Sequence, residues 1–128
     1  MSIVKADKNY ENGAPPDPKL IAAIGKLAEE LFKAGVMLET GGLLPSAMGA
    51  RLHAAGGKIT VKDGPFTEAK ELIGGYAIMQ VRSKEEAVEL GKKFMQVHID
   101  VLGPSYEGQL EVRQMFDGAD CSPEAGKR

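Results

Sequence analysis

Asp63 and His53 are the two side chains of this sequence best suited to moving a proton. Asp63 opens the run Asp63-Gly64-Pro65-Phe66, and a carboxylate at the end of a strand can act as a general base when a cavity covers it. An imidazole gains and loses its proton near neutral pH, so a covered His53 can act as acid or base. Each also has a simpler interpretation. Asp63 can accept backbone amide hydrogens in a turn, and His53 can be a surface residue.

Three further residues can hold a substrate, namely Arg113, Tyr76 and Arg51. Arg113 can hold a carboxylate through two parallel hydrogen bonds, and Tyr76 on the same face can donate another. Arg51 lies two positions before His53, on the same side of an extended strand. The alternatives are an ion pair between Arg113 and a neighbouring glutamate, and simple packing for Tyr76.

No residue pattern points to a metal or another cofactor, and we expect neither. His53 and His98 would need further metal ligands that nothing in the spacing supplies. His98 follows Phe94 by four residues on an apolar helical stripe, which favours a packed histidine with one hydrogen bond. Cys121 has no second cysteine to pair with and no basic neighbour to activate it. No glycine-rich segment is followed by lysine and serine or threonine at the spacing of a phosphate-binding loop.

A hairpin at residues 51–62 must position Arg51 and His53. Gly56 and Gly57 supply the two positive-φ residues that a tight hairpin turn needs. With that turn, Leu52 is opposite Val61 and His53 is opposite Thr60. One face then carries Leu52, Ala54, Ile59 and Val61, which we expect to face the core, and the other carries Arg51, His53, Thr60 and Lys62.

The remaining elements are predicted from periodicity, caps and turn residues. Asp17 and Pro18 begin a helix at residues 18–34, and Ser83 with Glu86 forms a capping box for a second helix that ends at Gly103. Strands are predicted at residues 1–6, 36–38, 75–82 and 109–116, loops at residues 7–17 and 40–49, and a mobile tail at residues 117–128.

This order of elements predicts an α+β domain over residues 1–116 in the split βαβ arrangement, an antiparallel sheet with two helices on one face. The other face would carry Tyr76, Ile78, Gln80, Arg113 and Met115, a set too apolar to be left in water. A second copy of the sheet, related by a two-fold axis, is the simplest cover. The space between the two sheets would be a mixed polar and apolar cavity suited to small ligands.

The composition of the chain limits the kinds of partner that it is expected to bind. The 128 residues have a net charge of −2, and 43% of them are hydrophobic, which suits one globular domain. We expect no nucleic-acid partner because no long basic run is present. No apolar stretch is long enough to span a membrane and no signal peptide is recognisable, so the cytoplasm is the expected location.

Residues 63–76 resemble the signature of the DGPF proteins within the YCII-related family. The likeness extends from about residue 4 to residue 115, through Lys33-Ala34-Gly35-Val36, Gly41-Gly42-Leu43, Pro45-Ser46, Gly49-Ala50-Arg51 and Val112-Arg113. It implies a ferredoxin-like fold that pairs into a dimeric α/β barrel. Some relatives resemble muconolactone-isomerase-like enzymes, and others are encoded beside, or fused to, extracytoplasmic-function sigma factors. One dehydrochlorinating branch uses a His–Asp dyad whose histidine begins the first helix. The matching segment here is Pro18-Lys19-Leu20-Ile21, so that dyad does not carry over.

Three functions are consistent with these residues. The first is a cofactor-independent acid–base enzyme, of isomerase or lyase type, that acts on a small organic acid in the inter-sheet cavity of a homodimer. Asp63 and His53 would transfer protons and Arg113 would hold the acid. The alternative is a non-catalytic ligand-sensing or protein-binding dimer linked to transcription regulation. The third is a structural dimer whose cavity holds only water.

Overall fold

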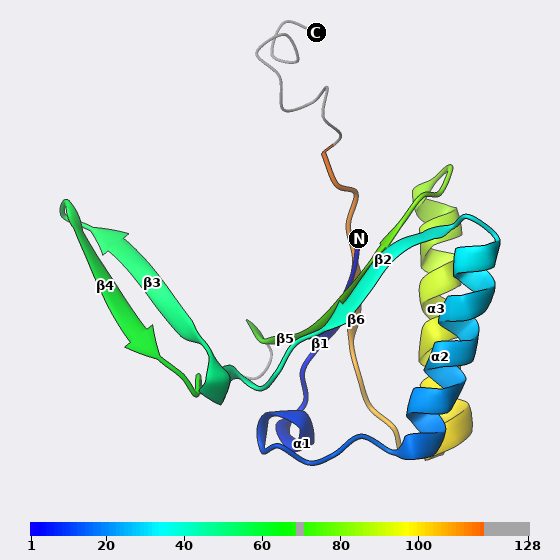
Figure 1. Ribbon diagram of the computed structural model, residues 1–128, viewed down its shortest axis with the longest axis horizontal. Helices are drawn as coiled ribbons and strands as arrows, with labels where there is room; N and C mark the ends of the chain where they lie inside the picture. Colours follow the sequence, from blue (N-terminus) through cyan, green and yellow to red (C-terminus); the bar gives the residue numbers. More distant parts are fainter. Residues whose placement is uncertain (69–70, 117–128) are drawn as a thin grey trace, which may run out of the picture.

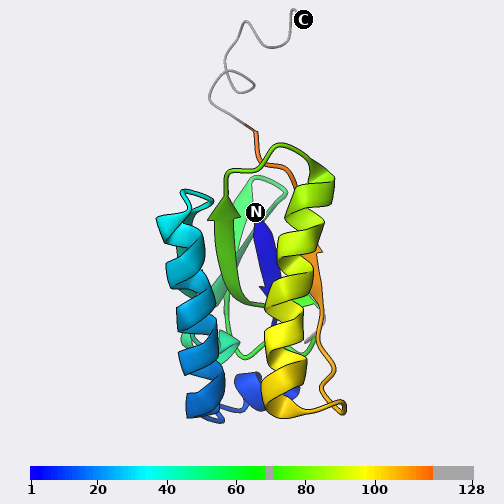
Figure 2. The same ribbon diagram turned by 90° about the vertical axis from the view of Figure 1, so that its right-hand side faces the viewer.

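A four-stranded antiparallel sheet with two long helices on one face forms the body of the protein (Figures 1 and 2). The computed structural model describes residues 1–68 and 71–116. Its elements are β1 Ser2–Lys5, α1 Lys8–Glu11, α2 Pro18–Lys33, β2 Met37–Gly42, the short 3-10 turn η1 Ser46–Met48, β3 Ala50–Ala55, β4 Lys58–Asp63, β5 Ile73–Met79, α3 Lys84–Leu102 and β6 Leu110–Val112. The expected tail at residues 117–128, which includes Cys121, lies outside the described residues.

The strand order β2-β5-β1-β6 agrees with the split βαβ arrangement and is compatible with a ferredoxin-like fold. Ile3 is opposite Tyr76, and Ser2 is opposite Ala77. Since side chains alternate along a strand, Ser2 and Ala77 lie on the helix side and Ile3 and Tyr76 on the open side. The predicted division of this strand between the two faces is therefore confirmed.

Local signals begin and end both long helices as expected. The Asp17 carboxylate accepts a hydrogen bond from the Lys19 amide at 2.8 Å, and Gly35 follows the end of α2 with φ of +74°. The Ser83 hydroxyl accepts from the Glu86 amide at 3.1 Å, and α3 stops at Gly103. These short-range interactions explain why the helix boundaries could be predicted from sequence.

The two predicted loops, residues 7–17 and 40–49, both contain regular structure. The strand expected at residues 36–38 extends to Gly42, because Thr40, Gly41 and Gly42 pair with β5. The Tyr76 ring lies across Gly41 and occupies the space of a side chain there. An added Cβ at Gly41 would lie 3.0 Å from this ring. The loop expected at residues 7–17 contains α1, where the Asp7 carboxylate accepts from the Tyr10 amide at 2.7 Å.

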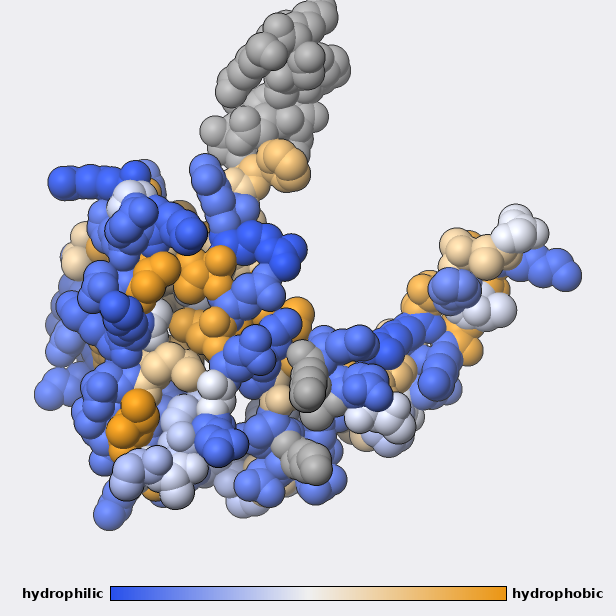
Figure 3. All heavy atoms as spheres, turned by 180° about the vertical axis from the view of Figure 1, so that it is seen from behind, coloured by the Kyte–Doolittle hydropathy of each residue, from blue (hydrophilic) through white to orange (hydrophobic). Residues whose placement is uncertain are grey.

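The hairpin has the predicted register but not the predicted surroundings. Leu52 is opposite Val61 and the turn glycines have positive φ, as expected. Strands β3 and β4 form a separate sheet that projects from the body, and every residue in them is exposed (Figure 1). The expectation that its apolar face packs on the core of the same chain is wrong. Leu52, Ile59 and Val61 are 70%, 71% and 63% exposed, and Figure 3 shows apolar residues along the projecting arm. Alternation decides which residues share a face, but not what that face contacts.

Candidate functional site

The run from Asp63 to Phe66 forms a corner that ties the hairpin to the segment before it. The Gly64 amide donates to the Gly49 carbonyl at 3.0 Å, and the Gly64–Pro65 peptide bond is cis. A Cβ added at Gly64 would lie 1.8 Å from the Ser46 carbonyl oxygen. Only glycine permits this close approach of two backbone segments.

Ser46 joins this corner to α1. Its hydroxyl accepts from the Phe66 amide at 3.0 Å and donates to the Glu11 carboxylate, which also accepts from the Ser46 amide at 2.9 Å. The Arg51 guanidinium lies 4.0 Å above the centre of the Phe66 ring. Phe66 is half-buried beneath Arg51 and is not anchored in the core.

A hollow of about 670 Å³ lies at this corner and includes Glu11, Ser46, Arg51 and Phe66 in its lining. Ser46 and Glu11 bond to each other and to the backbone, and Arg51 lies over the Phe66 ring. These contacts fit a structural role for the run from Asp63 to Phe66 better than a role in holding a ligand. Glu11 and Ser46 are 35 residues apart along the chain, so no sequence spacing signals that they bond to each other.

Asp63 and His53 lie on opposite faces of the hairpin. Asp63 is opposite Ala50 and therefore shares the face of Leu52, whereas His53 shares the face of Arg51. Both are exposed, and among the described residues no side-chain hydrogen bond involves the Asp63 carboxylate. Within one chain the two proton-transfer candidates are thus not brought together.

Tyr76 lies on the open face of the four-stranded sheet. Its hydroxyl donates to Glu39 at 3.3 Å, and its carbonyl accepts from the Thr40 hydroxyl at 2.9 Å. The negative charge of Glu39 raises the pKa of Tyr76 above 10.0, since that charge disfavours the phenolate. Tyr76 is therefore a protonated hydrogen-bond donor at neutral pH.

Arg113 belongs to the opposite margin of the same face. It pairs with Glu111, two residues earlier, and Lys5 approaches the same carboxylate at 3.7 Å. The Glu111 position is directly opposite Ile3, which in turn is opposite Tyr76. Two cations thus share one carboxylate beside an apolar strip. Lys5, Glu39 and Glu111 were missed in the sequence. Alternation with Val4 and Leu110 would have placed Lys5 and Glu111 on this face, but the register of β2 shifts between Met37 and Glu39, so alternation could not place Glu39.

His98 is buried on α3, as its place on the apolar stripe predicts. Its Nδ1 lies 2.8 Å from the Phe94 carbonyl oxygen, and its ring lies between Phe94 and Tyr106, with centroid distances of 4.6 and 5.1 Å. The interpretation as a packed histidine with one hydrogen bond is confirmed.

The described residues hold neither a metal-binding cluster nor a helix that could cross a membrane. Residues 1–68 and 71–116 hold no group of three or more His, Cys, Asp or Glu side chains placed to bind a metal ion. No helix in this part of the chain is both long and apolar enough to cross a membrane.

Comparison with known proteins supports the likeness seen in the sequence. A family model described as the YCII-related domain matches residues 1–102. DGPF is an alternative name for the same family. The uncharacterized protein R00369 of Rhizobium meliloti (strain 1021) is 26% identical over 99 residues, which are 77% of this chain and 75% of that protein.

Proposed function

The chain belongs to the YCII-related domain family, and on that premise we propose that it works as a homodimer that binds a small organic acid on its open sheet face. The carrying observation is the pair of cations, Lys5 and Arg113, that share the carboxylate of Glu111 at the margin of an apolar strip.

Two unpartnered surfaces of the same chain support the dimer. The hairpin exposes Leu52, Ile59 and Val61, and an isolated two-stranded hairpin is only marginally stable in water. The open sheet face carries Ile3, Tyr76 and Ile78 without a covering layer from its own chain (Figure 1). A two-fold axis lets each copy use its hairpin to cover the other, which buries both surfaces at once.

The charges beside the strip favour an acid as the ligand. Two cations share a single carboxylate, which leaves a net positive charge at that margin of the face. Arg113 is 73% exposed, so its guanidinium can turn toward a carboxylate through paired hydrogen bonds. Ile3 and Ile78 would contact the apolar part of such an acid, while Tyr76 and Glu39 close the far end.

Binding of a carboxylate should therefore depend on Arg113. We expect benzoate to bind more tightly than benzamide, and Arg113→Gln to weaken benzoate binding by about tenfold or more, since charged hydrogen bonds are the stronger kind. Isothermal titration calorimetry measures both affinities. Lys93→Gln removes one positive charge from the exposed side of α3 and is the matched control. Equal affinity for benzoate and benzamide, or an unchanged affinity in Arg113→Gln, would refute the proposal.

An acid–base reaction on the bound acid is the second candidate function, and the hairpin faces favour Asp63 as its base. Asp63 shares the apolar face that a dimer would bury, whereas His53 lies on the opposite face. In an isomerisation, Asp63 would take a proton from the carbon beside the carboxylate and return it at another carbon.

The test of this step is exchange of the hydrogens on the carbon beside the carboxylate of phenylacetate with deuterium from the solvent, followed by NMR. Asp63→Asn should abolish exchange, because an amide cannot accept the proton, while His53→Gln should leave it unchanged. Exchange that continues in Asp63→Asn would exclude this carboxylate as the base. Absence of exchange in the unaltered protein would exclude the reaction and leave binding as the function.

A further inference from the structure

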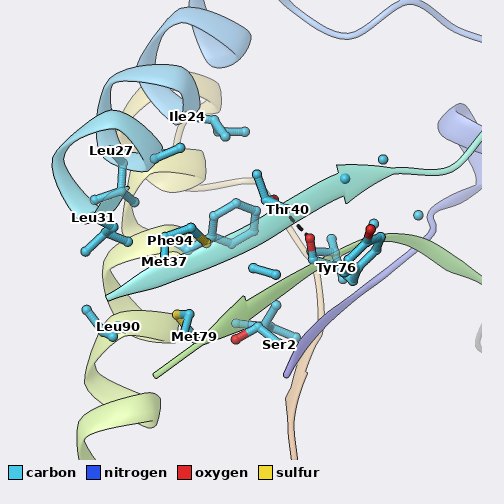
Figure 4. Close-up of a pocket in the computed structure, with 18 of the residues that line it drawn as sticks. Ser2, Ile24, Leu27, Leu31, Met37, Thr40, Tyr76, Met79, Leu90 and Phe94 are labelled. Atoms are coloured by element: carbon cyan, nitrogen blue, oxygen red, sulfur yellow. Dashed lines mark hydrogen bonds between the residues drawn. The ribbon is translucent and has the colours of Figure 1, made fainter. Parts of the chain in front are cut away.

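The space between the two long helices and the sheet is a cavity of about 390 Å³. Large apolar side chains line it from both sides, with Leu27 and Leu31 from α2, Leu90 and Phe94 from α3, and Met37 and Met79 from the sheet (Figure 4). Protein interiors are normally close-packed, with few voids larger than a water molecule. This volume instead lies in the range of small-molecule pockets, roughly 300–1,000 Å³.

The side chains around the cavity do not fill it. No residue of α2 is buried, although the helix directs Leu27 and Leu31 toward the sheet (Figure 4). Among the described residues, no large side chain is less than 2% exposed. The helices therefore stand over the sheet with room for an occupant between the two layers.

One polar atom in the cavity lacks a partner. Ser2 is 5% exposed, and its hydroxyl is the buried side-chain polar atom without a hydrogen bond among residues 1–68 and 71–116. Its side chain points to the helix side of the sheet, toward Met79 and Leu90 (Figure 4). The nearby Thr40 hydroxyl is already bonded to the Tyr76 carbonyl. A buried hydroxyl without a partner is costly, so a ligand atom that bonds to Ser2 would remove this cost.

The lining excludes a charged ligand. None of its described residues is Asp, Glu, Lys or Arg, and the Nδ1 atom of His98 is used by the Phe94 carbonyl. A charge in such surroundings would lose its hydration without gaining an ion pair. The ligand that fits is therefore apolar and uncharged, with one group that can bond to a hydroxyl.

From these observations we propose that the helix–sheet cavity is a binding site for an uncharged apolar molecule that carries one hydroxyl or carbonyl group, which bonds to Ser2. A dry 150 Å³ cavity holds benzene, so this larger one accommodates roughly 10 to 15 non-hydrogen atoms. The site lies on the helix side of the sheet, opposite the open face, and Tyr76 also borders it (Figure 1).

Two probes of equal size test the role of Ser2. 2-Naphthol carries a hydroxyl group where 2-methylnaphthalene carries a methyl group. The fluorescence of both probes is easily followed because the chain has no tryptophan. The unaltered protein should bind 2-naphthol about tenfold more tightly than 2-methylnaphthalene. Ser2→Ala should remove this preference and leave the affinity for 2-methylnaphthalene unchanged.

A second pair of variants tests the location. Ala28 lines the cavity on α2, so Ala28→Phe should fill part of it and lower the affinity for both probes at least tenfold. Ala22→Phe adds the same ring to an exposed position of the same helix and should not alter binding. Far-UV circular dichroism checks that each variant is folded. Benzoate binding should be unchanged in Ala28→Phe, which separates this site from the one on the open face.

The two pairs of measurements either support the site or overturn it. Loss of the preference in Ser2→Ala together with weakened binding in Ala28→Phe supports the site. Failure of both probes to bind the unaltered protein would overturn it. So would equal binding in Ala28→Phe and Ala22→Phe, or a preference for 2-naphthol that persists without the Ser2 hydroxyl.

Discussion

Replacing Ile59 by lysine is expected to convert the proposed homodimer into monomers. Ile59 is 71% exposed on the apolar face of the hairpin, the face that a second copy would bury. An ammonium group buried there without a partner should weaken dimerisation by on the order of 100-fold or more. Sedimentation equilibrium over a range of protein concentrations measures the change in the dimer dissociation constant.

The adjacent residue supplies the control. Thr60 is exposed on the opposite face of the same strand, opposite His53, so Thr60→Lys adds the same charge where no contact is expected. It should leave the dimer intact. A monomeric unaltered protein, or equal dissociation constants for the two variants, would contradict the proposed arrangement.

Gly64→Ala is expected to destabilise the fold by about 2 kcal/mol or more. The new Cβ would lie 1.8 Å from the Ser46 carbonyl oxygen, and a backbone atom cannot turn aside as a flexible side chain can. The corner must therefore open, which weakens the bond from the Phe66 amide to the Ser46 hydroxyl. Urea unfolding measures the free-energy change, and hydrogen exchange should report lost protection of the Gly64 and Phe66 amides.

Gly25→Ala is the matched control for this substitution. Gly25 lies within α2, and a Cβ there would have no neighbour within 4 Å. Alanine is the better helix former, so this variant should be neutral or more stable by up to about 1 kcal/mol. If the free energy of unfolding of Gly64→Ala is also within about 0.5 kcal/mol of that of the unaltered protein, the corner does not have this tight backbone contact.

The role of the family signature changes once the structure is considered. The sequence favours Asp63 as the residue for chemistry in the run from Asp63 to Phe66. In the structure, Gly64 and Phe66 have the more definite roles, because they bind the hairpin base to Ser46 and, through it, to Glu11. A motif can thus be distinctive because it builds a corner, even where a residue beside it remains a candidate for chemistry.

The contacts of the other candidate residues were also only partly predictable from the sequence. Sequence alternation correctly placed Tyr76 on the open sheet face, but the glutamates that contact it and Arg113 come from positions that carried no motif. The unpaired Ser2 hydroxyl gave no signal at all, since a serine near the start of a strand is ordinary. Only the surrounding helices make it a buried group without a partner.

The sequence by itself determined the features that depend on neighbours along the chain. The Asp17 and Ser83 caps began the helices, Gly56 and Gly57 set the hairpin register, and alternation sorted the strands into faces. Only the tertiary structure decided where the hairpin projects, that Gly64 meets Ser46, and that the helices leave a cavity above the sheet. The physical reason is the distance along the chain over which each kind of interaction acts. Caps and turns are set by hydrogen bonds and backbone sterics within a few residues, whereas close approach and cavity volume arise between segments far apart in the chain, which periodicity cannot place in space.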